Sequence, residues 1–134
     1  MWWTGRVAND TDVADVADVA EVTHWSEVYE AALLRNDVGV LDELFWNDPD
    51  VVRFGLADMQ HGYAEVVAWR ATAPPISADR QITSRRVLAL APGVVAVDIT
   101  FADDPATIGR QSQTWIRVGA GWRIARAHVS VIPA

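Results

Sequence analysis

The chain has 134 residues, the length of a single domain, and a formal net charge of −7. So acidic a protein is poorly suited to bind nucleic acid or an anionic membrane surface. It contains no cysteine and no lysine, which excludes disulfides, thiol nucleophiles and lysine Schiff bases and leaves proton transfer to Asp, Glu, His or Tyr.

Residues 1–21 are expected to form a variable acidic tail or helix extension ahead of one domain over residues 22–134. Residues 1–11 indicate a loose tail without the apolar core of a signal peptide. No run in the chain approaches membrane-spanning length, so we expect a soluble, cytoplasmic protein. From residue 12 to 20 the triplet Asp-Val-Ala repeats. Because a three-residue period drifts around a helix, it makes no clean apolar stripe, and we expect a frayed helical segment here.

Three helices are predicted in the first half of the domain. Over residues 22–36 apolar side chains fall at spacings of three and four, which places them on one face of a helix. Asp37 can cap a second, short helix over residues 38–45. A third helix is predicted over residues 63–72, and the pair Pro74-Pro75 ends it.

The strands follow a simple order. A short strand over residues 51–55 precedes the third helix, and two long strands over residues 81–90 and 94–101 form a hairpin. Residues 109–131 form a second long hairpin around the turn Gly119-Ala120-Gly121. This order predicts an α+β fold, in which a curved antiparallel sheet forms a cone closed by three N-terminal helices, with one pocket inside.

The last hairpin alternates in polarity, but neither of its two faces is purely apolar. On its first strand Gln111, Gln113 and Trp115 share one face, and on its second strand His128 shares a face with Trp122. Glutamines and a histidine beside tryptophans favour a pocket wall, although an ordinary exposed hairpin fits equally well. A slip of one residue in the register would exchange Gln113 for its neighbour Ser112.

Several strings of this sequence resemble the nuclear-transport-factor-2-like superfamily, which includes ketosteroid isomerases and SnoaL-type cyclases. The closer resemblance is to the AtzH-like family, which contains a decarboxylating amidohydrolase of cyanuric acid breakdown and accessory proteins of oxalurate catabolism. The most specific strings are Val-Arg-Phe-Gly at residues 52–55 and Gly-Arg-Gln-Ser-Gln-Thr-Trp at residues 109–115. The other matching strings lie at residues 29–33, 41–46, 121–124 and 127–130.

The resemblance implies a catalytic pair, Tyr29 and Arg53, and a strong homodimer built on the outer face of the sheet. The implied reaction is the cofactor-free loss of carbon dioxide from a small, polar, anionic N-carboxy urea such as 1,3-dicarboxyurea, which gives allophanate. Two alternatives stay open. One is an isomerase or cyclase that uses Asp98, and the other is a non-catalytic accessory subunit or ligand-binding protein of ureido-acid catabolism.

The dimer also has a physical basis, because the helices can cover only one face of the sheet. Residues 94–101 and 114–131 leave too many apolar side chains for the other face to be wet. We therefore expect two copies of the chain to pair through this outer face.

The catalytic candidates also have structural interpretations. Tyr29 lies on the apolar face of its helix, where it is either a core tyrosine or a proton donor. Arg53 interrupts an apolar strand, where it either pairs with a core acid such as Asp98 or binds a substrate carboxylate. Asp98 itself interrupts a strand, where it is either a general base or the partner of an arginine.

Five more residues are candidates for substrate binding. Gln111 and Gln113 can hydrogen-bond a urea-like ligand, or they can belong to a solvated face. His128 is more often structural than catalytic. Arg70 can guard the pocket mouth or lie on the surface, and Trp46, after the second helix, completes the set.

No metal ion or cofactor is predicted. His24, His61 and His128 are scattered along the chain, and none forms a local pair at the spacing of metal ligands. The sequence also lacks a glycine-rich phosphate loop.

Overall fold

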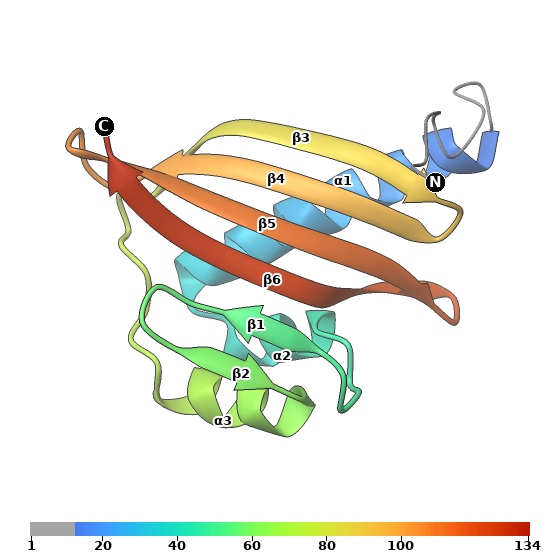
Figure 1. Cartoon of the computed structure of the whole chain (residues 1–134), viewed down its shortest axis with the longest axis horizontal. Helices are drawn as coiled ribbons and strands as arrows, with labels where there is room; N and C mark the ends of the chain where they lie inside the picture. The colour runs from blue at the N-terminus through green and yellow to red at the C-terminus, as the bar shows by residue number, and fades with distance from the viewer. Residues whose placement is uncertain (1–12) are drawn as a thin grey trace, which may run out of the picture.

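The computed structural model describes residues 13–134, and the tail expected over residues 1–11 lies outside the described residues. Three helices and one six-stranded sheet make up the described chain, which confirms the predicted α+β fold (Figure 1). In chain order the elements are α1 (Val13–Arg35), α2 (Val38–Leu44), β1 (Val52–Phe54), β2 (Met59–His61), α3 (Tyr63–Thr72), β3 (Gln81–Ala91), β4 (Val94–Ala102), β5 (Thr107–Val118) and β6 (Gly121–Pro133).

The acidic repeat forms the first turns of α1, which begins nine residues earlier than the apolar periodicity predicts. Its acids bind the ends of the long strands. Asp18 is buried, and it accepts hydrogen bonds from the backbone amide of Gly93 (2.8 Å) and from Nη2 of Arg117 (3.0 Å). Glu21 accepts from the same Arg117 nitrogen (3.2 Å). The repeat is therefore anchored to the sheet and is not a frayed end.

The two shorter helices begin and end close to their predicted limits. Asp37 is the N-cap of α2, and its Oδ1 accepts from the amide of Val40 (3.3 Å). Because helix N-termini leave amides without backbone partners, this bond fixes where α2 begins. Helix α3 ends at Thr72, and Ala73 is already extended before Pro74-Pro75.

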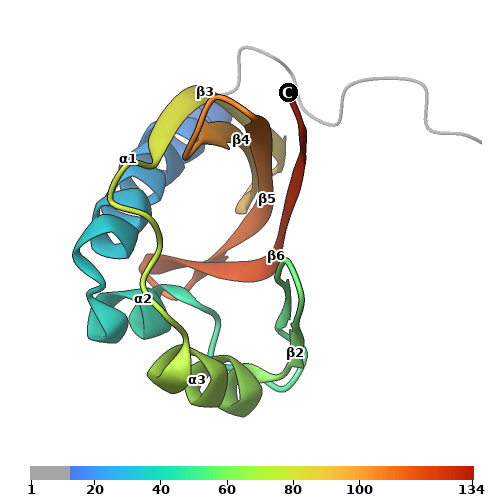
Figure 2. The ribbon, with the colours of Figure 1, turned by 90° about the vertical axis from the view of Figure 1, so that its left-hand side faces the viewer.

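The strand order is β2-β1-β6-β5-β4-β3, and only β1 and β6 run parallel. The sheet curves around α1, which lies behind it in Figure 1, and α2 and α3 close one end of the curve (Figure 2). We call the face toward α1 the concave face and the other the convex face. The short strand β2 was not predicted, because it buries the polar Gln60 and exposes the apolar Met59, the reverse of the usual alternation.

The final hairpin contains a β-bulge. Thr114 pairs with Arg126, but the next residue, Trp115, pairs with Ile124, so Ala125 is an extra residue on β6. One extra residue exchanges the side chains that face inward, which is why neither face of the predicted hairpin is purely apolar. The concave face therefore takes Trp122 and Ile124 before the bulge, and Ala127 and Val129 after it.

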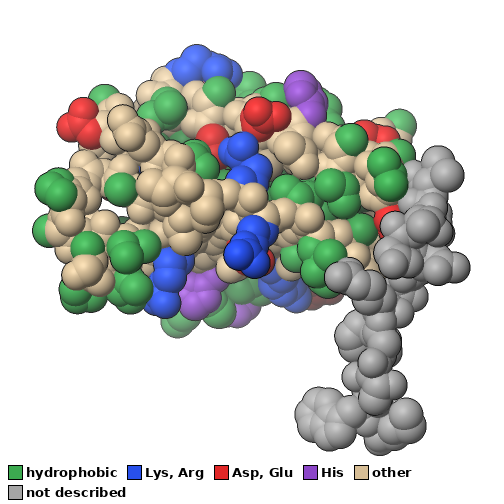
Figure 3. Space-filling view, turned by 90° about the horizontal axis from the view of Figure 1, so that it is seen from above, with side chains coloured by type: hydrophobic (Ala, Val, Ile, Leu, Met, Phe, Trp, Pro, Cys, Tyr) green, Lys and Arg blue, Asp and Glu red, His purple; other side chains and the backbone are tan. Residues whose placement is uncertain are grey.

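The outer surface is mixed in character. Seen from the β3 side, arginine side chains lie among apolar ones (Figure 3). The convex face exposes apolar side chains on three strands, namely Phe54, Leu88 and Ile108. No helix within residues 13–134 is long and apolar enough to cross a membrane.

Candidate functional site

Tyr29 lies on α1, over the concave face of the sheet. Its side chain is 4% exposed, and its ring packs edge-on against Phe45, with 6.2 Å between the ring centroids. Its hydroxyl has no hydrogen-bond partner within residues 13–134, whereas the hydroxyl of Tyr63 donates to the carbonyl of Asp42 (2.9 Å). The hydroxyl is not one of the fully enclosed polar atoms that lack a partner, so a ligand can reach it.

Arg53 lies on β1 and points to the same face. Its Nη1 donates to Asp58 (2.7 Å) and to the side chain of Gln60 (2.9 Å). Its guanidinium carbon lies 3.5 Å from the ring of Trp69. Burial lowers the pKa of Arg53, and the nearby Tyr29 and Asp58 oppose this shift. The influence of Tyr29 on the pKa of Arg53 places the two predicted catalytic groups within electrostatic range of each other.

The loop after β1 brings Asp58 to Arg53. A Cβ atom on Gly55 would lie 2.6 Å from Oδ2 of Asp58 and 2.8 Å from Nη1 of Arg53. Only glycine leaves room for the ion pair at this point. One of the two interpretations of Arg53 paired it with a core acid such as Asp98, but its partner is Asp58, five residues along the chain.

Arg70 lies in the last turn of α3 and is buried, with 7% of its side chain exposed. The surface position favoured by the sequence analysis is therefore wrong. Its guanidinium carbon lies 4.7 Å from the ring of Trp69 and 6.0 Å from that of Phe45. Trp69 thus contacts both Arg53 and Arg70, although the sequence analysis did not select it. Its position beside Arg70 on a predicted helix was the only available signal.

Gln111 belongs to a buried network that the sequence did not predict. Glu30 on α1 accepts two hydrogen bonds from Arg80, at 3.1 Å from Nε and 2.9 Å from Nη2. It also accepts from Nε2 of Gln111 (2.9 Å), whose Oε1 accepts from Arg80 (3.3 Å). The polar groups of Gln111 are therefore bound within the protein, and this network ties α1 to β5.

Gln113 and Trp115 follow Gln111 on the concave face. Oε1 of Gln113 accepts from the indole nitrogen of Trp115 (3.0 Å), which fixes the orientation of the amide. Its Nε2 is buried and has no partner among the described residues. Across the sheet, Gln113 pairs with Ala127 and Ala127 pairs with Arg53. Gln113 and Arg53 therefore stand on either side of a small residue on the same face.

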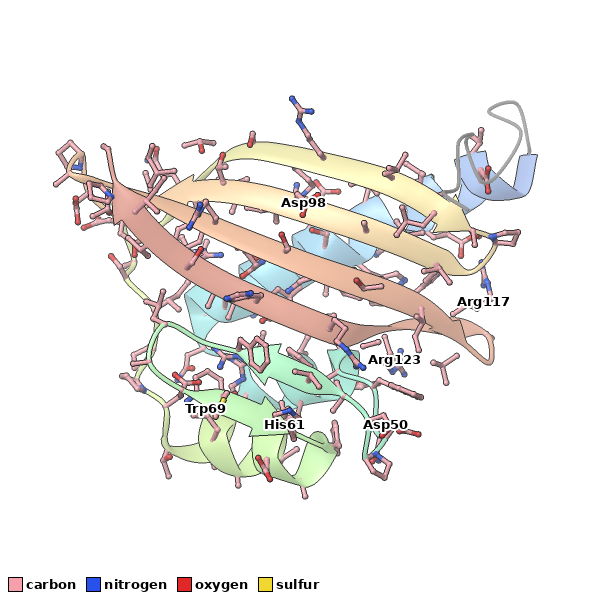
Figure 4. The ribbon with its side chains drawn as sticks, viewed as in Figure 1. Asp50, His61, Trp69, Asp98, Arg117 and Arg123 are labelled. Atoms are coloured by element: carbon pink, nitrogen blue, oxygen red, sulfur yellow. The ribbon has the colours of Figure 1, made fainter. Side chains whose placement is uncertain are left out.

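Asp98 and His128 lie on the opposite, convex face. Asp98 is exposed and accepts a hydrogen bond from the hydroxyl of Ser112 (2.7 Å), while His128 packs edge-on against Phe54. In Figure 4 Asp98 lies on β4, well apart from Trp69 on α3. The structure does not bring these two candidates together with Tyr29, because alternation and the bulge direct their side chains outward.

The remaining candidate, Trp46, follows α2 and lies beside β6. Its backbone amide donates to the carbonyl of Ile124 (3.0 Å), and its half-buried ring packs on the core. Across residues 13–134, no three histidine, aspartate or glutamate side chains gather in an arrangement that could hold a metal ion.

The fold defines the class of this protein. The cone is that of the NTF2-like, or cystatin-like, proteins. An NTF2-like protein of unknown function from Pseudomonas putida aligns with a TM-score of 0.71 and 17% identity, over 86% of this chain and 87% of that one. At this identity the likeness concerns the fold alone.

Within this class, the chain belongs to the AtzH-like family, whose model matches residues 11–134. The match includes the acidic repeat that the sequence analysis set apart from the family. A cystatin-like fold protein from Burkholderia xenovorans is 37% identical, with a TM-score of 0.83 over 87% of this chain and 92% of that one. A protein of unknown function from Pectobacterium atrosepticum is also 37% identical, with a TM-score of 0.85 over 92% and 98%. No functionally curated protein matches significantly.

Proposed function

We propose that this protein is a cofactor-free decarboxylating amidohydrolase that releases carbon dioxide from small N-carboxy ureas such as 1,3-dicarboxyurea, giving allophanate. The observation that carries the proposal is the Tyr29 hydroxyl, which forms no hydrogen bond within residues 13–134 and lies close enough to the half-buried cation Arg53 to affect its pKa. A phenol in this setting can donate its proton to a bound anion. Membership of the AtzH-like family supports the same pair of residues.

The reaction breaks the bond between the urea nitrogen and the departing carboxylate carbon. The electron pair of that bond stays on nitrogen as carbon dioxide leaves. Tyr29 donates its hydroxyl proton to this nitrogen as the negative charge develops, and the phenolate then recovers a proton from water. The product keeps the second carboxylate, and charge and atoms balance without a cofactor.

Arg53 positions the substrate in this scheme. Asp58 and Gln60 hold its Nη1, and Trp69 stacks against its guanidinium, so the cation has a defined direction. A fixed guanidinium binds a carboxylate through a planar fork and keeps the breaking bond in line with the phenol. The ion pair with Asp58 offsets part of the charge of Arg53. The guanidinium of Arg53 therefore orients the ligand more than it neutralises the ligand's charge.

The test is turnover by the purified protein with 1,3-dicarboxyurea as the only substrate, followed through released carbon dioxide. Tyr29→Phe keeps the ring and is expected to lower turnover about 10²-fold or more, the usual effect of losing one positioned proton donor. Tyr63→Phe is the matched control, because it removes a hydroxyl that binds a backbone carbonyl, and it should retain turnover. Normal turnover by a folded Tyr29→Phe variant would contradict the proposal. No turnover by the wild type would favour the accessory or ligand-binding alternative.

We also propose that the protein is a homodimer that pairs through the convex face. Phe54, Leu88 and Ile108 are exposed there, between 38% and 48%, and burying them would remove apolar surface from water. Sedimentation at micromolar concentration should give a dimer, and Leu88→Glu should shift it toward monomer. Leu34→Glu, at an exposed position on α1, should leave it unchanged. A wild-type monomer would refute the proposal.

A further inference from the structure

Arg70 is a buried cation without an ion-pair contact among the described residues. Its Nε and Nη2 have no hydrogen-bond partner within residues 13–134, and no described carboxylate lies within ion-pair distance of its guanidinium. Arg53 and Arg80 are paired by contrast, Arg53 with Asp58 and Arg80 with Glu30. An unpaired buried charge is strongly unfavourable, so the position of Arg70 is costly in the absence of an anion.

Arg53 lies close to Arg70. Arg53 and Arg70 both contact the indole of Trp69, at 3.5 and 4.7 Å, and the charge of Arg70 contributes to the lowered pKa of Arg53. One carboxylate, Asp58, is bound to this pair of guanidiniums, and it contacts Arg53 alone. Asp42 is also within electrostatic range of Arg70, and its Oδ1 is buried without a hydrogen-bond partner among the described residues. Burial raises the pKa of Asp42 although Arg70 opposes this shift, so Arg70 does not fully offset the burial of that carboxylate. The group formed by Arg53, Arg70 and Trp69 therefore keeps positive charge at Arg70.

The concave face adds another donor without a partner. Nε2 of Gln113 is buried, and the bond from Trp115 to its Oε1 prevents the amide from turning its oxygen inward. Around Arg53, the buried side-chain nitrogens without a partner among the described residues belong to the guanidinium of Arg70 and the amide of Gln113. All of them are hydrogen-bond donors. Such surroundings suit a ligand that carries acceptors and negative charge.

We infer that Arg70 is the specificity-determining residue of this site, and that it binds the carboxylate that stays on the substrate while Arg53 orients the reacting group. This inference rests on the proposed function and adds a second anion-binding point to it. A cation with its full charge on the departing carboxylate would stabilise the substrate more than the transition state, in which that group becomes neutral carbon dioxide. Arg53 is neutralised in part by Asp58, so it orients that group at a smaller cost. The retained carboxylate is charged throughout the reaction, so holding it on Arg70 anchors the substrate without opposing the chemistry.

The inference can be tested by binding alone, with an unreactive pair of probes. Glutarate separates its two carboxylates by as many chain atoms as 1,3-dicarboxyurea, and glutaramate replaces one of them with a neutral amide of the same size. By calorimetric titration the wild type should prefer glutarate by about 10-fold or more, the usual effect of one charge-assisted contact. Arg70→Gln should bind both probes with similar, weak affinity. Arg35→Gln, which removes an exposed charge, should keep the preference.

Thermal unfolding of the ligand-free protein supplies a second readout. Because Arg70→Gln removes a buried charge that has no partner, the variant should melt at or above the wild-type temperature. Glutarate should raise the melting temperature of the wild type only. A variant that keeps the preference for glutarate, or that melts well below the wild type or fails to fold, would overturn the inference, since Arg70 would then be a structural residue. Neither probe reacts, so these results do not depend on whether Tyr29 catalyses decarboxylation.

Discussion

Replacing Arg80 with methionine is expected to destabilise the protein more than any change to an exposed arginine. The side chains of Arg80 and Glu30 are 6% and 9% exposed, and the carboxylate accepts two hydrogen bonds from the guanidinium. Methionine fills a similar volume and can still pack on Phe101, over which the guanidinium lies at 3.7 Å. The substitution therefore removes the charge and its hydrogen bonds with little loss of packing.

The expected loss is about 3–5 kcal/mol, the range measured when one partner of a buried ion pair is removed and the other stays charged. Gln111 still donates to the carboxylate, which keeps the loss inside that range. The double change Arg80→Met with Glu30→Met removes both charges. It should recover most of the loss, except for about 1–3 kcal/mol from the unpaired amide of Gln111.

Urea unfolding followed by tryptophan fluorescence measures these differences. The matched control is Arg35→Met, which breaks an exposed ion pair with Asp37 (3.3 Å) and should change the free energy of unfolding by less than about 1 kcal/mol. If Arg80→Met loses no more than this control, the buried network does not hold α1 on the sheet. If the double variant is less stable than Arg80→Met, the argument from an uncompensated charge is wrong.

Two further predictions concern stability. Gly109→Ala should lower the free energy of unfolding by about 1–3 kcal/mol in urea melts, because the new methyl group would overlap the ring of Phe101 on β4. Asp42→Asn should stabilise the protein at neutral pH. Burial raises the pKa of Asp42 above its ordinary value of 3.8, so its charged form is penalised in the folded state at higher pH and the penalty disappears as the group protonates. The difference in melting temperature between Asp42→Asn and wild type should therefore grow from acidic to neutral pH, and a constant difference would contradict this sign.

The helices and long strands could be predicted from the sequence because their signals are local. Asp37 caps α2 and α3 ends before Pro74-Pro75, as the periodicity and capping residues indicate. The faces of the last hairpin could not be assigned in this way, since the bulge at Ala125 moves the remainder of β6 by one residue. The consecutive apolar residues Ile124 and Ala125 interrupt the alternation, and they are its only sequence signal.

The candidate site was predicted less completely than the fold, because its partners are distant in the sequence. Glu30 and Arg80 are 50 residues apart, and no local pattern joins them. Arg70 is a different case. It lies four residues after Val66, which is completely buried, so helical spacing alone could have placed its side chain inward. Preference for arginine on surfaces outweighed that spacing in the sequence analysis.

Two acids on the concave side are held by arginines, since Glu30 is bound by Arg80 and Asp58 is bound by Arg53. A carboxylate held in this way is poorly suited to remove a proton from a substrate. An isomerase needs a carboxylate that is free to act as a base beside its substrate. Asp98, which the sequence analysis named for that role, faces outward.

Most of the buried side-chain atoms left without partners in the same region are donors. Within residues 13–134 they are Nε and Nη2 of Arg70 and Nε2 of Gln113, against one carboxylate acceptor, Oδ1 of Asp42. Fixed donors stabilise an anionic ligand and the negative charge that develops on it, without reorganising during the reaction. An N-carboxy urea makes both demands, because it binds as an anion and needs a proton on nitrogen as carbon dioxide leaves. The excess of donors over free acceptors is thus the physical reason to prefer decarboxylation to isomerisation.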